Sequence, residues 1–223
     1  MLWSAFTLAF FGFLHSSEFT SPSSTHFNPL VHLACSDVIF TSDGSLLLQL
    51  KASKTDPFWT GCSIALTPSG RSVCAVRAMR RYLAHRFPGN STPLYLFLTG
   101  QFLTRDKITS ILRFQLQRLG FAAESYASHS FRIGAATTAA EAGLPPRLIQ
   151  TLGRWSSNCY TQYIRTPATH STPLQAWESS TGQCTACYVV LVFPHVPGSI
   201  NLGHNLGAHL PLSYHLHQAG WVL

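Results

Sequence analysis

The sequence predicts an α+β fold, mostly helical with one small antiparallel β-sheet, and three observations lead to this class. A turn signal between two apolar runs indicates a hairpin early in the chain, and a third apolar run follows it. Helical signals with caps and stops then fill the sequence from position 73 onward. A hydrophobic content of 46% in 223 residues is ample for a buried core in one or two domains.

The predicted sheet comprises residues 35–41, 45–51 and 60–66. Asp43 and Gly44 stand between the first two runs, and an Asp-Gly pair between apolar segments is a strong hairpin signal. The third run follows after a short polar connection. We therefore expect three short strands joined in sequence order.

Helices are expected over residues 73–86 and 105–119, both of which carry several arginines. A further helix begins at Ser128 or Ser130, either of which can cap it, and its small residues allow close packing.

Two short helices complete the predicted order. The sequence GLPP at 143–146 stops the preceding helix, and Pro146 suits the first turn of the next one, over residues 147–152. Gly153 ends that helix. A last short helix begins near Ser157 and carries Tyr163.

The stretch from 129 to 165 contains the parts needed to break a phosphodiester covalently. The hydroxyl of Tyr163 can attack a phosphate, and the fork of Arg132 can hold non-bridging oxygens while negative charge builds on them. His129 can move a proton, and the indole N–H of Trp155 can donate a hydrogen bond. His129 and Arg132 are three residues apart, so both lie on one face of the first helical turn.

These residues resemble the C-terminal catalytic box of the tyrosine recombinase (phage integrase) family. The resemblance rests on HSFR at 129–132, GRW at 153–155 and YIR at 163–165. The fuller run is most similar to recombinases of eukaryotic mobile elements, the crypton and DIRS-like groups. Tyr160 lies three residues before Tyr163 on the same helix face, but the family pattern places the nucleophile before Ile-Arg and so selects Tyr163. A packing aromatic is the expected role of Tyr160.

The resemblance implies a catalytic domain over residues 1–167, in which Tyr163 forms a 3′-phosphotyrosine. Arg132 and the group at position 15 would stabilise the transition state, and His129 and Trp155 would assist. The implied partner is DNA, bound by a homo-oligomer, with no membrane and no metal or nucleotide cofactor. Relatives usually have a separate helical domain that clasps the other side of the DNA, and we expect it to be absent here.

The family also requires a lysine on a β-hairpin beside the active site. The connection between the second and third predicted strands contains SKTD at 53–56, which resembles the turn that carries this lysine. Lys54 is therefore the candidate general acid that protonates the leaving 5′ oxygen. A solvated loop lysine is the alternative interpretation.

Position 15 is where the sequence departs from the family. Relatives have an arginine after a hydrophobic helix, followed three residues later by glutamate, and Glu18 places His15 in that frame. Histidine is mostly neutral at pH 7, with an unperturbed pKa of about 6.5, and lacks the two-point fork of arginine. Losing one preorganised donor costs on the order of 10²–10³ in rate. We therefore expect catalysis to be slow or lost.

The apolar run at 1–14 has two interpretations. It lacks a basic n-region and a clean small-residue cleavage site, and it is short for a membrane span. The resemblance makes it the first buried helix of the catalytic domain, and a signal peptide is the alternative.

Charge supports a polyanionic partner. All 15 lysines and arginines lie between Lys51 and Arg165, and residues 1–167 contain 7 acidic residues, which gives that segment a net charge of +8. A solvated helix face is the alternative for any single arginine. The residues expected to contact DNA are Arg80, Arg81, Arg147, Arg154 and Arg165.

Residues 168–223 differ in composition, with no lysine or arginine and Glu178 as the one acidic residue. Their histidines follow no helical or strand period. Cys184 and Cys187 can be combined with a downstream histidine into a zinc site, but the spacing matches no known pattern. We predict a poorly ordered tail without a metal site.

Three functions follow from these observations. The first is DNA recombination through Tyr163. The second is a degenerate, mobile-element-derived DNA-binding protein without catalysis, which is favoured by His15 and by the unusual tail. Both predict a nuclear location. The third is a secreted protein with a zinc-binding tail, which rests on residues 1–14 and on the cysteine pair.

Overall fold

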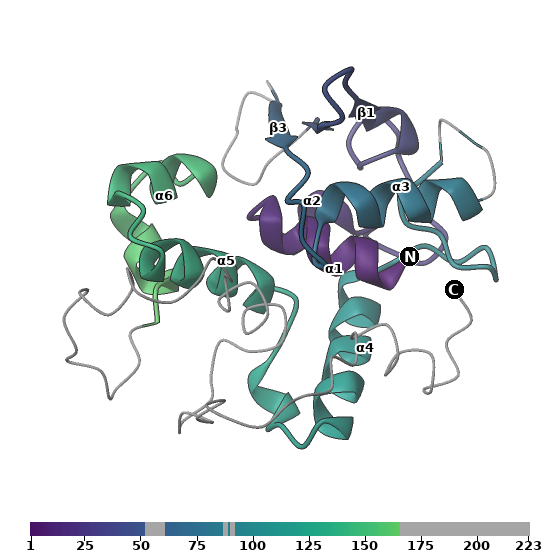
Figure 1. Ribbon diagram of the computed structural model, residues 1–223. Helices are drawn as coiled ribbons and strands as arrows, with labels where there is room; N and C mark the ends of the chain where they lie inside the picture. The colour runs from purple at the N-terminus through teal and green to yellow at the C-terminus, as the bar shows by residue number, and fades with distance from the viewer. Residues whose placement is uncertain (52–60, 87–88, 90–91, 166–223) are drawn as a thin grey trace, which may run out of the picture.

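The computed structural model describes residues 1–51, 61–86, 89 and 92–165, and Figure 1 shows their arrangement. The predicted class is confirmed, since helices predominate and one three-stranded antiparallel sheet is present. In chain order the helices and strands are α1 (Leu2–Phe11), α2 (Ser16–Phe19), β1 (Val38–Phe40), β2 (Leu46–Leu50), β3 (Cys62–Leu66), α3 (Ala75–His85), α4 (Arg105–Arg118), α5 (Ser130–Glu141) and α6 (Pro146–Leu152). The 3₁₀ turns are η1 (Cys35–Asp37), η2 (Ala123–Ser125) and η3 (Asn158–Tyr163).

The sheet has the order β1-β2-β3, and each strand is antiparallel to its neighbour. Phe40 pairs with Leu46 across the first hairpin, and Leu50 pairs with Cys62 across the second. Asp43 fastens the first turn, because its carboxylate accepts hydrogen bonds from the Ser45 N–H and hydroxyl. The Thr41 hydroxyl also donates to this carboxylate, and its bond, followed by the two from Ser45, holds the pKa of Asp43 below its usual value. The hairpin predicted from the Asp-Gly pair is therefore confirmed.

A large hydrophobic cluster, the main cluster, joins α1 to the sheet, α3 and α4. β2 contributes alternate leucines, because side chains alternate between the two faces of a strand. Tyr82 and Tyr95 stack with ring centroids 5.4 Å apart. The most deeply buried large side chains of the main cluster are Leu8, Leu14, Leu46, Leu48, Met79, Leu94, Tyr95, Leu103 and Ile108.

A second, smaller group, the site cluster, joins α5, α6 and η3 to the end of α1. Its buried members are Phe10, Phe13, Ala135, Ala136, Ala139, Ile149, Trp155 and Tyr160. In Figure 1, α5 and α6 lie to the left of α1, whereas the sheet and α3 lie above it and to its right. The helix α1 therefore contributes to both clusters, as expected for a buried first helix.

The start of α5 differs from the prediction. Neither Ser128 nor Ser130 caps the helix; its N-cap residue is His129, whose side chain makes no capping hydrogen bond. Ser130 Oγ instead accepts the Ala127 N–H at 3.0 Å, in the turn before the helix. The Ser128 hydroxyl is buried without a partner among the described residues. The prediction failed because the hydroxyl of Ser130 bonds backward along the chain, which is an alternative open to short polar side chains.

Three further expectations concern the apolar run at 1–14, Lys54 and the tail. Within the described segments, no helix combines the length and the apolar character needed to cross a bilayer. Lys54 and the tail at 168–223 lie outside the described residues.

Candidate active site

Arg132 occupies the first turn of α5 and is 7% exposed. Its Nη1 donates a hydrogen bond to the carbonyl of Phe13 at 2.5 Å, and its Nη2 donates to the carbonyl of Gly153. The guanidinium lies over the Trp155 ring, with Cζ 4.4 Å from the ring centroid. One buried cation thus joins three segments that are distant in sequence.

The pKa of Arg132 is lowered, first by burial and then by the neighbouring charge of Arg154, while Glu18 acts in the opposite direction. An arginine side chain does not lose its proton in proteins, so Arg132 remains a cation at neutral pH. Two of its five N–H donors have backbone partners. Charge that is held in a poorly solvated position interacts more strongly with an anion than the same charge in water.

Trp155 forms the floor of the site. Its ring is 5.1 Å from the Tyr163 ring and 6.3 Å from the Tyr160 ring, measured between centroids. Gly153 makes this packing possible, because a Cβ there would lie 1.8 Å from Cζ3 of the indole. Both predicted tyrosines therefore reach the same tryptophan.

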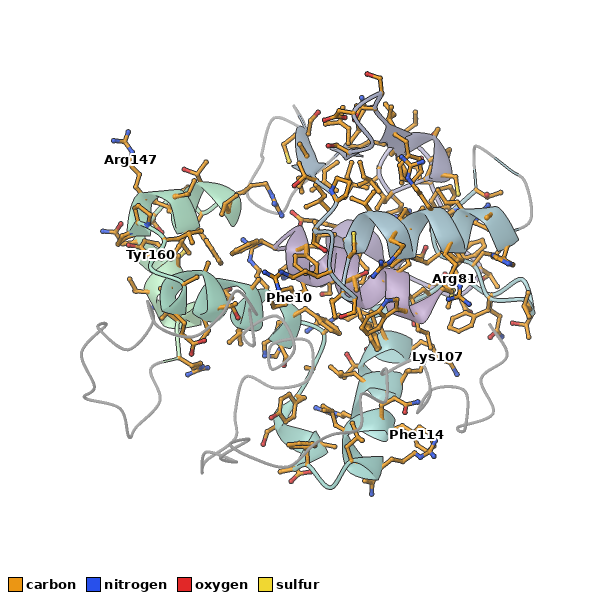
Figure 2. The ribbon with its side chains drawn as sticks, viewed as in Figure 1. Phe10, Arg81, Lys107, Phe114, Arg147 and Tyr160 are labelled. Atoms are coloured by element: carbon orange, nitrogen blue, oxygen red, sulfur yellow. The ribbon has the colours of Figure 1, made fainter. Side chains whose placement is uncertain are left out.

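The two tyrosines differ in exposure. Tyr160 is buried within the site cluster, where Figure 2 shows it close to α6 and α5, and Tyr163 is half-buried. Their helix is 3₁₀ rather than α, and its three residues per turn place both on one side. The ring of Tyr163 lies 6.0 Å from Cζ of Arg132. Of the two, Tyr163 is thus the one both near the arginine and partly open to solvent.

His15 is the N-cap residue of α2. Its N–H donates to Oε2 of Glu18 at 2.7 Å, and its Nδ1 accepts the Ser17 N–H at 3.3 Å, as in a capping box. The same Nδ1 also lies 2.8 Å from the Ser17 hydroxyl. Position 15 is two residues beyond Phe13, whose carbonyl binds Arg132. Position 15 is therefore close in sequence to a carbonyl that Arg132 binds, while its imidazole is engaged in its own turn.

Arg154, predicted from the sequence to contact DNA, has its guanidinium turned into the protein. Its Nη2 forms an ion pair with Glu18 at 2.8 Å and donates to the carbonyl of Phe13 at 3.2 Å. Its Nη1 donates to the carbonyl of Gly12 at 3.0 Å. The backbone of Arg154 is left-handed, with φ of 57°, which a non-glycine residue adopts only at a conformational cost. Sequence reasoning missed this ion pair, and its one signal was the glutamate three residues after position 15.

His129 is exposed at the start of α5. Its pKa is lowered by partial burial and then by the positive charges of Arg105 and Arg165. The lowered pKa favours the neutral imidazole, the form whose lone pair can accept a proton.

Lys51 directly follows β2 and is a second lysine near the place where the family has its β-hairpin lysine. The ammonium of Lys51 pairs with Asp37 at 2.7 Å and donates to the carbonyl of Pro29 at 2.6 Å. These contacts fasten the end of β2 to η1 and the preceding loop. The geometry gives Lys51 a structural role. The prediction for Lys54 lies outside the described residues and stays a prediction.

The other arginines predicted to contact DNA do not form one group. Arg147 projects outward from α6 on one side of the molecule, and Arg81 lies on α3 on the other (Figure 2). Arg80 stacks over the Phe40 ring at 4.2 Å and donates to the carbonyl of Gly44, so it also braces the first hairpin. Arg165 is exposed after η3. No group of three or more potential metal ligands occurs within the described ranges.

No family profile matches this sequence, and no curated protein matches it. Among solved structures, the chain is similar to the Tn1549 transposon integrase in complex with a circular intermediate DNA, with 17% identity and a TM-score of 0.46 over 73% of this chain and 54% of that one. It is also similar to the XerA recombinase, with 19% identity and a TM-score of 0.47 over 73% of this chain and 51% of that one. The chain spans about half the length of these structures.

Proposed function

We propose that this chain is a DNA breaking and rejoining protein of the tyrosine recombinase type, with residues 1–167 as its catalytic domain. The observation that carries the proposal is the grouping of Arg132 and Tyr163 around the Trp155 ring. These are the residues in which the sequence resembles the family. A mobile element of the crypton or DIRS-like kind, acting in a nucleus, is the proposed origin.

In the proposed reaction, the Tyr163 hydroxyl attacks the scissile phosphorus. A bond forms between the phenolic oxygen and phosphorus, and the bond from phosphorus to the 5′ oxygen breaks. Arg132 stabilises the charge on the non-bridging oxygens, and Lys54 gives a proton to the leaving oxygen. His129, whose lowered pKa favours the neutral ring, accepts the phenolic proton. The covalent bond conserves the energy for rejoining, and no metal takes part in these steps.

The second candidate is a DNA-binding protein that has lost catalysis. The imidazole of His15 is engaged with Ser17, and the guanidinium of Arg154 is engaged with Glu18. His15 has no guanidinium, and both Nη atoms of Arg154 are bonded to protein groups, so neither side chain offers the phosphate a second arginine fork beside Arg132. The net charge of +8 on residues 1–167 still favours duplex DNA, with weak affinity that falls steeply as salt rises.

Covalent trapping on a nicked suicide duplex distinguishes these candidates. His15→Arg should raise trapping by at least about 10²-fold, because it restores a fork that stabilises the transition state. Tyr163→Phe in that background should abolish trapping, whereas Tyr160→Phe should leave it largely intact. Equal trapping by the unmodified chain and by His15→Arg would disprove the loss of function at position 15. Trapping that survives Tyr163→Phe would disprove the assignment of the nucleophile.

A further inference from the structure

Thr137 connects the helix of Arg132 to the segment of Tyr163. Its hydroxyl donates a hydrogen bond to the carbonyl of Tyr163 at 3.2 Å and accepts one from the N–H of Arg165 at 3.1 Å. The side chain is 7% exposed. A single buried hydroxyl therefore satisfies backbone groups on both sides of Ile164.

The hydroxyl of Thr137 bonds differently from those of three other helical threonines. Thr109, Thr138 and Thr151 each donate to the carbonyl four residues earlier in their own helix, at 2.9 Å. Thr137, by contrast, bonds to a residue 26 positions later in the sequence. The ordinary bond within the helix is thus given up for a tertiary one.

Thr137 links the segment of Tyr163 to the helix that carries Arg132. Arg132 lies on the same helix, and its guanidinium is fixed by the carbonyls of Phe13 and Gly153. η3 is a short 3₁₀ turn, which has poorer hydrogen-bond geometry than an α-helix. The backbone at its end takes its support from α5, on which the buried cation also sits.

We infer that Thr137 is a positioning residue for the nucleophile: its two hydrogen bonds fix the backbone of Tyr163 through Arg165 at a set place relative to Arg132. This inference rests on the proposed function. Displacing a reacting group by about 1 Å can reduce a rate by about 10²-fold. The hydroxyl acts through the backbone and does not touch the substrate.

Thr137→Val tests the inference, because valine keeps the shape and removes both hydrogen bonds. Thr137→Ser keeps the hydroxyl, and Thr138→Val is the matched control one residue away, where only a bond within the helix is lost. Thermal unfolding followed by circular dichroism confirms that each variant is folded. Hydrogen exchange at the Arg165 amide should accelerate by at least about tenfold in Thr137→Val and stay unchanged in the other two variants.

Trapping with DNA in excess is the second measurement, made in the full-length His15→Arg chain. Thr137→Val should lower the single-turnover rate by about 10- to 100-fold while the dissociation constant for DNA stays unchanged, and Thr137→Ser should restore the rate. Unchanged exchange at Arg165 would show that the Thr137 hydroxyl does not hold this backbone segment. Faster exchange with an unchanged trapping rate would overturn the positioning role. Absence of trapping in every variant, with faster exchange in Thr137→Val, would overturn the proposed function. The two hydrogen bonds of Thr137 to the backbone would still be supported.

Discussion

The main cluster and the site cluster are held together by different forces. The main cluster consists of fully buried leucines, aromatic rings and Met79 from several elements. The site cluster has small alanines and a few aromatic rings, and it is tied to the α1–α2 turn by the guanidinium groups of Arg132 and Arg154. Apolar burial is non-directional, whereas these hydrogen bonds demand particular positions. The difference indicates that the first region supplies stability and the second supplies geometry.

Removing apolar volume from each cluster should have the largest effect. Leu8→Ala in the main cluster and Ile149→Ala in the site cluster start from 0% and 1% exposure. Each change should cost about 2–5 kcal/mol in its own region. Urea unfolding should show a lower midpoint for the whole chain with Leu8→Ala. With Ile149→Ala, hydrogen exchange should accelerate mainly over residues 130–165. An equal loss across the chain in both variants would mean that the clusters form one cooperative unit.

Breaking the ion pair tests the polar connection. Arg154→Met should destabilise the fold by about 3 kcal/mol, because Glu18, with a side chain 2% exposed, would keep a buried charge without its arginine. Arg147→Met, on the exposed face of α6, is the matched control and should change stability by about 0.5 kcal/mol or less. Adding Glu18→Gln to Arg154→Met should recover part of the loss. If the two arginine variants were equally stable, the polar connection would be unimportant.

Gly153→Ala tests the contact below the site. The added Cβ would meet the Trp155 ring, so the indole must move, at an expected cost of about 1–3 kcal/mol. A shift of the Trp155 indole resonance in an NMR spectrum, with the resonances of the main cluster unchanged, is the expected result. A spectrum identical to that of the parent chain would contradict the packing described.

The smallest expected effect concerns pH. The pKa of His129 is lowered from 6.5 in the folded chain by burial, Arg105 and Arg165, so the unfolded chain binds this proton more readily. The stability contribution is therefore complete above about pH 6.5 and declines as the pH falls toward the folded-state pKa. NMR titration should give a midpoint below 6.5 that rises in Arg165→Ala. A midpoint unchanged by Arg165→Ala would remove Arg165 as a cause.

Local patterns were enough to predict most of the elements, but they were not enough to predict the long-range contacts that arrange the candidate site. The sheet, its hairpin and the helices around Ala75–His85 and Arg105–Arg118 follow from turn residues and periodicity. The inward direction of Arg154 depends on Glu18, 136 positions away, and the role of Thr137 depends on a carbonyl 26 positions away. Hydrophobic periodicity reports local structure and does not identify contact partners that are far apart in sequence. The predicted serine cap of α5 was wrong for a related reason, because the Ser130 hydroxyl accepts the Ala127 N–H instead.

The distances in sequence that Arg132 and Arg154 span have a consequence for the order of folding. Their hydrogen bonds to Phe13 and Gly12 close loops of 119 and 142 residues. Closing a loop costs entropy that grows with its length, and contacts of this kind form slowly. During synthesis, α1 can meet α3 well before the ribosome has released residue 154. The folding nucleus is therefore expected to contain α1 and α3, with Arg132 and Arg154 making their contacts last, upon a helix that is already in place.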